Sequence, residues 1–444
     1  MDENNKHAET PLVSIIVPVY NTEEYLEECL NCLVNQTIKN IEIICIDDAS
    51  TDDSLKILNL YAKSDDRIIV LNNETNIGQS TTRNLAIEKA KGEYITFFDS
   101  DDVIDTTAYE KLYNEAKEHD QDIIIFSFKR FNQDGEEWFE ILQEKSNITE
   151  YIEKTNIIEK PELIYNTIAC NKFIKKDFLK KINLKFMENT LFEDIPFSTK
   201  LFCSTDSIGI YPDVIYYWRV RDQSTTQTND NIKNLKDRIF VSKDILDYVN
   251  KEENEKFKPL TEPIYKKLLE HDFPIYLNQL DISNEEYEKI MLNEVLPFIK
   301  TFSMESIDSL DGMLKIKYEL LFDKNIENLK IIAAYERSND NRIKEVKTKI
   351  KEKNEKIKEL RIQKEEIRAR KEEIRARKEE IRIRKEEIRK EKNAEIRRLK
   401  KINKKQRKEI KELKSTKGWV KYKTNNLYER GKNKFHITTK FLKN

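Results

Sequence analysis

Four consecutive residues near position 100 have side chains that could hold a metal ion. Asp99, Ser100, Asp101 and Asp102 directly follow an apolar run at residues 94–98, which predicts a buried strand. Ligands of open α/β sheets bind beyond the carboxyl ends of the strands, where this cluster would lie. Crowded carboxylates raise one another's pKa unless a divalent cation or hydrogen-bond donors compensate their charge. The cluster therefore predicts a metal site, and the alternative is a solvated acidic turn that caps the next helix.

The elements before this cluster predict how it is positioned. Apolar runs of strand length occupy residues 11–20, 41–46 and 68–71, and residues 81–90 have the pattern of a helix. Polar segments that can open helices follow the first two runs. With the run before the acidic cluster as the fourth strand, the order is βαβαβαβ. This order predicts an α/β fold with a mostly parallel sheet that is covered by helices on both faces.

The sequence has no glycine-rich phosphate loop. The chain contains only seven glycines and neither a GxGxxG nor a GxxxxGK[ST] string. Backbone amides therefore offer no evident cradle for the phosphates of a nucleotide. A diphosphate at this sheet would instead be neutralised by a metal ion on Asp101 and its neighbours. The missing loop strengthens the prediction of a metal site.

Four sequence strings carry a resemblance to a known enzyme family. In chain order they are VSIIVPVYNTEEYLEECL, IEIICIDDASTDDSL, NIGQSTTRNLAIEKAKGEYITFFDSDD and LFEDIPF. Together they resemble a family 2 glycosyltransferase of the GT-A fold, a nucleotide-binding domain that would span residues 11–226. The resemblance implies an inverting enzyme of the hexosyltransferase type. Such an enzyme moves a sugar from a nucleotide-diphosphate donor, usually UDP, to an acceptor hydroxyl with Mn²⁺ or Mg²⁺.

The resemblance assigns four residues to the nucleoside side of the donor. Asp48 would accept a hydrogen bond from the uracil ring, while Pro18 and Tyr20 would form the wall beside it. A carboxylate at this place favours a base that presents an N–H donor. Arg83 is similar to an arginine near the nucleotide, and the alternative is a surface charge on its helix.

The resemblance also assigns residues to the diphosphate. Asp99 and Asp101 form the DxD motif, in which the first acid meets the ribose and the last binds the bridging metal ion. Arg219 and Arg221 belong to a segment similar to the family's YxYRxRxxS motif and would supply cations near the phosphates. The two arginines alternate on a predicted strand, so they point to one face. The alternative for this pair is a solvated edge strand that uses charge against aggregation.

Two further segments complete the expected site. Glu193 and Asp194 resemble the family's ED motif, and inversion by direct displacement needs a carboxylate that takes the acceptor's proton. Asp194 is the candidate base and Glu193 would orient it. The alternative is a helix start, where acids are favourable in the first turn. Lys172 lies in a stretch similar to the family's WNKLY motif, with Cys170 where tryptophan is common, and is a candidate for the acceptor side.

The chain beyond the resemblance predicts helices. Residues 231–340 have amphipathic spacing that is typical of a small helical domain. Residues 342–413 contain no Pro or Gly and repeat KEEIRAR with isoleucine every seven residues, which predicts a long charged helix. Only one heptad position is reliably apolar. Two alternatives therefore remain, a coiled coil that forms a homo-oligomer and a solitary helix with i,i+4 ion pairs.

The C-terminal residues are strongly basic. Residues 393–444 carry 18 Lys and Arg against 4 Asp and Glu, although the whole chain has a formal net charge of −2. In the tail at residues 414–444, aromatic residues interleave with the lysines, which is typical of an anchor on an anionic membrane. A merely soluble tail is the alternative. Nucleic acid is a weaker candidate because no fold that reads it is recognisable.

These features together predict a cytoplasmic transferase at the inner face of a membrane. Residues 1–10 carry no apolar signal region, and no apolar run reaches the length of a membrane span. The acceptor would be a cell-surface glycan or a lipid-linked molecule. The opposing hypothesis is a non-catalytic scaffold or tether that works through its stalk and tail. It is disfavoured because every acid of the expected site is present.

Overall fold

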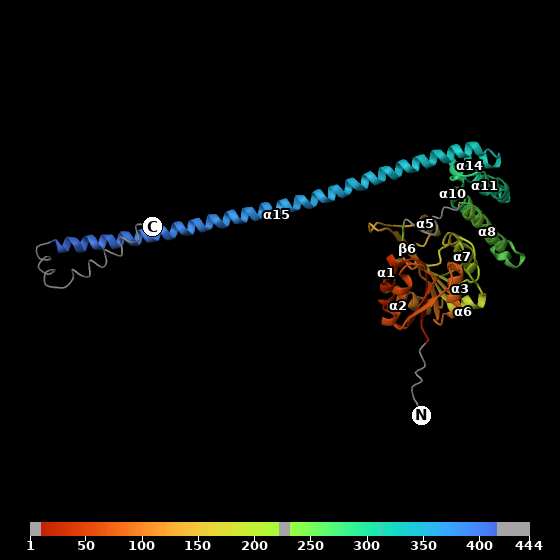
Figure 1. The fold of residues 1–444 in the computed structure, drawn as a ribbon, viewed down its shortest axis with the longest axis horizontal. Helices are drawn as coiled ribbons and strands as arrows, with labels where there is room; N and C mark the ends of the chain where they lie inside the picture. Colours follow the sequence, from red (N-terminus) through yellow and green to blue (C-terminus); the bar gives the residue numbers. More distant parts are fainter. Residues whose placement is uncertain (1–9, 222–230, 311, 415–444) are drawn as a thin grey trace, which may run out of the picture. The chain divides into compact units, whose positions relative to one another are not determined.

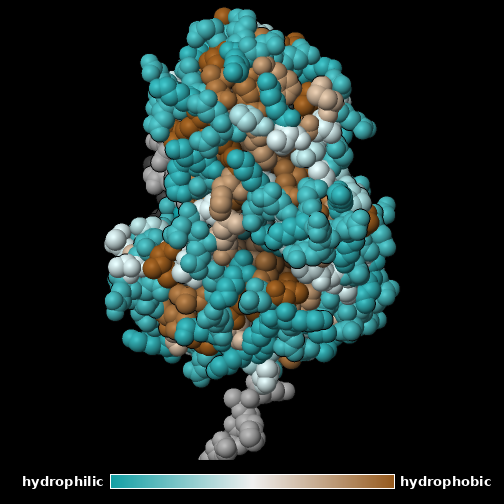
Figure 2. All heavy atoms as spheres, turned by 90° about the vertical axis from the view of Figure 1, so that its right-hand side faces the viewer, coloured by the Kyte–Doolittle hydropathy of each residue, from teal (hydrophilic) through white to brown (hydrophobic). Residues whose placement is uncertain are grey.

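The computed structural model describes residues 10–221, 231–310 and 312–414 (Figure 1). It divides into two compact units, residues 1–340 and residues 341–444, and each is described by itself. On the face seen in Figure 2 the surface is largely hydrophilic, and the apolar side chains gather in separate patches.

A mixed sheet of ten strands forms the base of the first unit. Its N-terminal strands are β1 (Val13–Val19), β2 (Ile41–Asp47), β3 (Ile68–Asn72) and β4 (Tyr94–Phe97). They pair in parallel in the order β3-β2-β1-β4. This arrangement confirms the parallel sheet that the alternating strand and helix signals predict, with strand ends that differ by one or two residues.

The second half of the sheet adds antiparallel neighbours, and of its strands the sequence predicts only the end of β10 that carries Arg219. The added strands are β5 (Val103–Ile104), β6 (Ile123–Phe131), β7 (Glu137–Trp138), β8 (Ile152–Thr155), β9 (Lys172–Lys175) and β10 (Ile208–Arg219). Strand β9 lies antiparallel between β4 and β6, while β10 runs parallel to β6. Several of these strands are only two to four residues long, too short to have a clear period of their own.

Helices cover both faces of the sheet (Figure 1). One face packs against α1 (Glu23–Val34), α2 (Ser54–Ser64) and α4 (Ala108–Glu118), and the other against α3 (Gln79–Lys89), α6 (Lys176–Ile182) and α7 (Asp194–Phe202). Strand β1 contributes side chains to both cores because its side chains alternate between the two faces. Ile15 and Val17 lie on one face and Ile16 on the other. Each such fully buried side chain contributes roughly 1.5–3 kcal/mol.

Residues 231–340 are helical, as their spacing predicts, and they share a core with the sheet. Leu235 and Ile239 of α8 (Asn231–Asn250) belong to the same hydrophobic cluster as Leu201 of α7. Between the strands lie α5 (Ile141–Ser146) and η1 (Pro161–Tyr165). After α8 come η3 (Glu252–Leu260), α9 (Thr261–Lys267), η4 (Leu268–Asp272), α10 (Pro274–Leu277), η5 (Leu280–Ile282), α11 (Glu285–Ile290), η6 (Met291–Val295), α12 (Leu296–Ile299), α13 (Met304–Asp308) and α14 (Gly312–Phe322).

A single helix, α15 (Ile326–Leu413), contains 88 residues and supplies the described part of the second unit. Its repeated isoleucines, such as Ile367 and Ile374, are 54% and 55% exposed. None of the described helices combines the length and the apolar character that a membrane span requires. The predicted membrane anchor from residue 415 onward lies outside the described residues.

Candidate active site

The residues singled out from the sequence come together at one cavity of about 440 Å³. It lies where β1, β2 and β4 end, at the carboxyl edge of the parallel strands. Ten of the eleven candidate residues line this cavity, and Lys172 is the exception. The ten are Pro18, Tyr20, Asp48, Arg83, Asp99, Asp101, Glu193, Asp194, Arg219 and Arg221.

Asp48, in the turn after β2, holds the loop between β3 and α3 in place. Its carboxylate accepts hydrogen bonds from the backbone N–H groups of Ile77 (3.0 Å) and Gly78 (2.9 Å) and from the side chain of Asn73 (2.8 Å). Gly78, which precedes α3, has a φ of +85°, a conformation that glycine adopts without steric cost. Asp48 therefore ties the loop before α3 to the cavity wall and has some acceptor capacity left over for a ligand.

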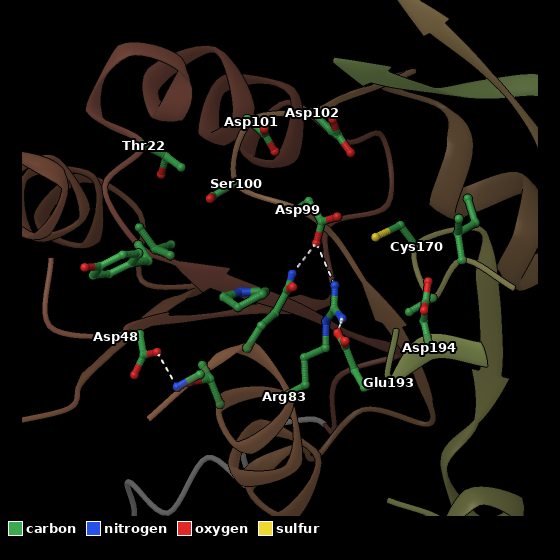
Figure 3. A pocket seen from close by; sticks show the side chains of 18 of the residues that line it. Thr22, Asp48, Arg83, Asp99, Ser100, Asp101, Asp102, Cys170, Glu193 and Asp194 are labelled. Carbon is green, nitrogen blue, oxygen red and sulfur yellow. Dashed lines mark hydrogen bonds and ion pairs between the residues drawn. The ribbon is translucent and has the colours of Figure 1, made fainter. Parts of the chain in front are cut away.

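Arg83 bridges the two acidic motifs (Figure 3). Its guanidinium donates to Asp99 at 2.8 Å and to Glu193 at 3.0 Å, and the residue is only 3% exposed. Burial alone would lower its pKa, but the charges of Asp99, Glu193 and Asp194 raise the pKa above its usual range. The alternative of a surface charge is therefore wrong. Arg83 is a buried cation that holds the DxD and ED acids together.

The three aspartates after β4 have different surroundings. Asp99 contacts Arg83 and Gln79, whereas Asp102 is buried and accepts hydrogen bonds from the Tyr216 hydroxyl and the backbone N–H of Arg219. Burial raises the pKa of Asp102 well above its usual value, and neighbouring aspartates raise it further. Asp102 therefore anchors the acidic turn to β10, while Asp99 remains at the cavity.

Asp101 carries an incompletely balanced charge. Burial raises the pKa of its carboxyl group, the charge of Asp99 adds to the shift, and Arg221 opposes it. Arg221 Nε lies 2.7 Å from Asp101 Oδ2 but has no well-aligned hydrogen bond there. This carboxylate is thus available to a stronger cationic partner.

Arg219 is packed inside the wall of the site. It donates to the backbone oxygen of Asp101 (2.7 Å) and to Glu28 of α1 (2.6 Å), and its guanidinium lies 5.0 Å from the centre of the Tyr25 ring. The alternative of a solvated edge strand is wrong for Arg219, because it is 9% exposed and β10 lies between β6 and β5. Sequence reasoning missed Tyr25 and Glu28, whose only signal is their place on the helix after β1.

The donor set of this cavity fits a divalent cation. Six carboxyl groups and three arginines line it, so the acids outnumber the cations. Within the described ranges, no three His, Cys, Asp or Glu side chains form a metal-binding group by themselves. However, Mg²⁺ is commonly held by one or two carboxylates together with substrate phosphates. Asp99 and Asp101 offer such oxygen ligands, so a cation completed by a diphosphate fits this site.

Glu193 and Asp194 stand at the start of α7, opposite the DxD turn (Figure 3). Burial raises the pKa of both carboxyl groups. The adjacent charge of Asp194 raises that of Glu193 further, whereas Arg83, Lys172 and Arg238 oppose the shift at Asp194. The preceding Phe192 has a φ of +66°, a strained conformation for a bulky residue. A raised carboxyl pKa is typical of general bases, and Glu193 in addition forms an ion pair with Arg83.

Lys172 lies beneath the cavity instead of lining it. Its ammonium group donates to Asn166 Oδ1 at 2.9 Å and to the backbone oxygen of Ile168, and the residue is fully buried. Burial lowers the pKa of Lys172 to about 7, although the nearby charge of Asp194 opposes the shift. The expected contact with an acceptor does not fit this position. Lys172 instead influences the charge of Asp194.

Comparisons with known proteins are consistent with this geometry. Residues 14–183 match the family model described as glycosyl transferase family 2. The chain is 32% identical to glycosyltransferase GlyG of Streptococcus pneumoniae over 245 residues, which are 54% of this chain and 81% of that protein. It is 37% identical to the poly(ribitol-phosphate) beta-glucosyltransferase of Bacillus spizizenii over 213 residues, 47% of this chain but only 32% of that protein.

A solved structure has the same fold. The crystal structure of S. aureus TarS 1-349 in complex with UDP-GlcNAc matches with a TM-score of 0.59 and 22% sequence identity. The match covers 74% of this chain and 92% of that one.

Proposed function

Because the chain belongs to glycosyl transferase family 2 and is a glycosyltransferase, we propose that it moves a sugar from a UDP-sugar donor to a hydroxyl group of a cell-surface glycan or lipid-linked acceptor. The observation that carries this proposal is one cavity that is lined by the DxD acids, the ED acids and three arginines. The crystal structure of TarS is a complex with UDP-GlcNAc, which supports UDP as the nucleotide to test first. The name of the Bacillus relative supports a surface polymer as the acceptor.

The proposed step is a direct displacement with inversion. The acceptor oxygen forms a bond to the anomeric carbon while the bond from that carbon to the diphosphate oxygen breaks. The electron pair leaves with the diphosphate, and the hydroxyl proton passes to the Asp194 carboxylate. The raised pKa of Asp194 lies closer to the operating pH than that of an ordinary aspartate, which favours proton transfer.

The donor side would be organised by the DxD turn. Asp101, with Asp99 beside it, would hold Mn²⁺ or Mg²⁺ against the diphosphate, and the cation would stabilise the charge of the departing group. Arg83 keeps Asp99 and Glu193 in fixed positions through its two ion pairs. Asp48, Pro18 and Tyr20 line the part of the cavity where the base would bind.

We also infer a place of action for the whole chain. The basic residues at 393–444 favour attachment to the anionic inner face of a membrane, where lipid-linked acceptors are available. Residues 342–413 would space the catalytic unit from this anchor or join copies into a homo-oligomer. The scaffold alternative lacks support, because the expected acids all line one cavity and the family is one of transferases.

UDP calorimetry with and without Mn²⁺ tests the donor site. We expect metal-dependent binding in the wild type, its loss in Asp101→Ala, and wild-type binding in Asp194→Asn. Asp194→Asn should nevertheless lower UDP release from UDP-sugars, measured with a cell-surface glycan preparation, by at least about 100-fold. Asp177→Asn, in the exposed first turn of α6, is the matched control.

The possible contrary results separate the parts of the proposal. Equal loss of UDP binding in Asp194→Asn would show that this residue is not the base. UDP binding that is equally strong with and without Mn²⁺ would reject the metal role of Asp101. Tighter binding of another nucleoside diphosphate would replace UDP as the donor nucleotide.

A further inference from the structure

A second cavity meets the first at the ED motif. It has a volume of about 660 Å³ and lies between β6, β10 and the helices that follow β10. Asp194, Phe192 and Trp218 line both cavities, so an acceptor in the second cavity would reach the candidate base. The charges that line this second cavity therefore indicate the chemical class of the acceptor.

The second cavity has a different charge balance from the first. Its cationic side chains are Arg130, Arg238 and Lys267, and its acids are Glu140, Asp194 and Asp272. His271 also lines the cavity, but burial lowers its pKa below the usual value. Lys267 and Asp272 pair tightly at 2.6 Å. The arginines are held less tightly, with Arg130 at 3.7 Å from Glu140 and Arg238 at 3.5 Å from Asp272.

Aromatic rings hold both arginines in place. The Arg130 guanidinium lies 4.4 Å from the centre of the Trp218 ring, and the Arg238 guanidinium lies 3.7 Å from the centre of the Phe192 ring. Stacking of this kind fixes the guanidinium plane and leaves its edges for hydrogen bonds. In both residues the buried Nε has no hydrogen-bond partner among the described residues.

The burial of these arginines makes an anionic ligand favourable. Burial lowers the pKa of Arg130, although Glu140 opposes the shift. Burial acts in the same direction on Arg238, but the charge of Asp272 raises its pKa above the usual value. A phosphate has oxygens that accept from a guanidinium in a bidentate manner, and both arginines line the cavity. A neutral sugar hydroxyl would bring no compensating charge. Of the groups found in surface polymers, a phosphodiester therefore matches this wall best.

We propose that the acceptor is a phosphodiester-linked chain whose phosphates bind Arg130 and Arg238 while a hydroxyl between them faces Asp194. Arg238 comes from α8 and stacks on the residue before the ED motif, so it would position the phosphate nearest the reacting hydroxyl. Arg130 comes from β6 and would hold a phosphate farther along the chain. This inference rests on the proposed function, since it names the acceptor class of the same site.

Binding of a short poly(glycerol phosphate) oligomer to the full chain tests the inference. The variants are Arg130→Gln, Arg238→Gln and the double variant, and a neutral oligosaccharide of equal length is the comparison ligand. We expect each single variant to weaken binding of the phosphate oligomer about tenfold, because each loses a charge-assisted contact. Arg238→Lys should restore part of the loss, since it keeps the charge but not the bidentate geometry.

The controls separate this cavity from other causes. Lys185→Gln removes an exposed cation that pairs with Glu88 outside both cavities, and it should leave binding unchanged. The basic C-terminal residues are identical in all variants, so their contribution cancels. Thermal melting identifies a variant that fails to fold, and Arg130 and Arg238 provide independent tests because they come from different elements.

Three outcomes would overturn the inference. They are equal binding of the phosphate oligomer by the wild type and the double variant, no binding by the wild type, and preference for the neutral oligosaccharide. UDP binding measured on the same variants distinguishes a wrong acceptor class from a wrong function. Retained UDP binding with any of these outcomes rejects only the acceptor class, whereas absent UDP binding in the wild type rejects the donor proposal.

Discussion

At the scale of single residues, the site works through buried charges that balance one another only in part. Arg83 is shared between Asp99 and Glu193, so neither acid receives a full positive charge. Asp194 has no hydrogen bond to Arg83, yet the charges of Arg83, Lys172 and Arg238 all act on it. Such partial compensation keeps a carboxylate basic without removing it from reach of a substrate.

The pH dependence of activity should reveal this balance. The base must be deprotonated, so a raised pKa of Asp194 means that kcat/KM falls with decreasing pH earlier than an ordinary aspartate would cause. Lys172→Met removes a cation that stabilises the Asp194 carboxylate, and we expect the acidic limb of the profile to move to higher pH. Because the pKa of Lys172 is about 7, the difference should grow as the pH falls below 7.

The same variant should also lower the free energy of unfolding. Methionine leaves the buried oxygens of Asn166 and Ile168 without their donor, at a cost of about 1–3 kcal/mol measured by denaturant unfolding. Lys175→Met, on the same strand but paired with Asp120 at the surface, is the matched control. An acidic limb that does not move in Lys172→Met would contradict the electrostatic role.

At the scale of elements, the ends of the strands determine where the acids lie. Strands β1, β2 and β4 are neighbours in the sheet, so the residues that follow them reach one edge. The loop before α3 then returns to Asp48, and α7 brings the ED acids to the opposite wall. The helix α15 differs from these elements because it extends into the second unit, where it is the only described element.

The heptads of α15 contain two kinds of surface. In the central repeats Ile367 takes position d, but Lys364 takes position a and arginines take positions e and g. Like charges at these positions would face each other between two copies. Near the start of the second unit, by contrast, position a holds Ile350 and Ile357, and position d holds Val346 and Leu360, with Lys353 at the d position between them.

We therefore expect any self-association of α15 to depend on its first heptads. Sedimentation velocity of the full chain should show an oligomer that Ile350→Asp with Ile357→Asp dissociates. The matched pair Ile374→Asp with Ile381→Asp, from the central repeats, should have a smaller effect. All four isoleucines are about half exposed in the single chain, with values of 53%, 48%, 55% and 52%. A monomeric wild type would instead favour the solitary helix.

At the scale of the whole molecule, charge is distributed unevenly along the chain. Residues 393–444 have a net charge of +14 by formal count, whereas the full chain has −2, so the preceding residues carry −16. An acidic catalytic unit and a basic C-terminal segment have different partners. Long-range attraction to an anionic surface would act on the C-terminal segment and fall off within the Debye length.

Removal of residues 415–444 should weaken binding to anionic vesicles. These residues contain eight Lys and Arg against one Glu, and each basic residue near such a surface contributes about 1 kcal/mol. In co-sedimentation with phosphatidylserine vesicles we expect at least a tenfold loss, smaller at high salt, with phosphatidylcholine vesicles as the control. Equal binding by the truncated and full chains would reject the membrane role of the tail.

The sequence by itself determined the parallel half of the sheet and the location of the acids. Both depend on local patterns, because apolar runs of β-branched residues predict strands and polar residues at their ends fall on one edge of a parallel sheet. The resemblance to a glycosyltransferase family placed the donor residues by motif. For this reason ten of the eleven candidates lie at one cavity.

Only the tertiary structure decided how these residues are paired and which of them a substrate can reach. Arg83 contacts acids that are 16 and 110 positions away, and Arg219 contacts Glu28, which is 191 positions away. Local periodicity carries no information about such contacts. For the same reason the burial of Lys172 and the cavity with Arg130 and Arg238 appeared only in the fold, because burial is set by distant elements that pack over a residue.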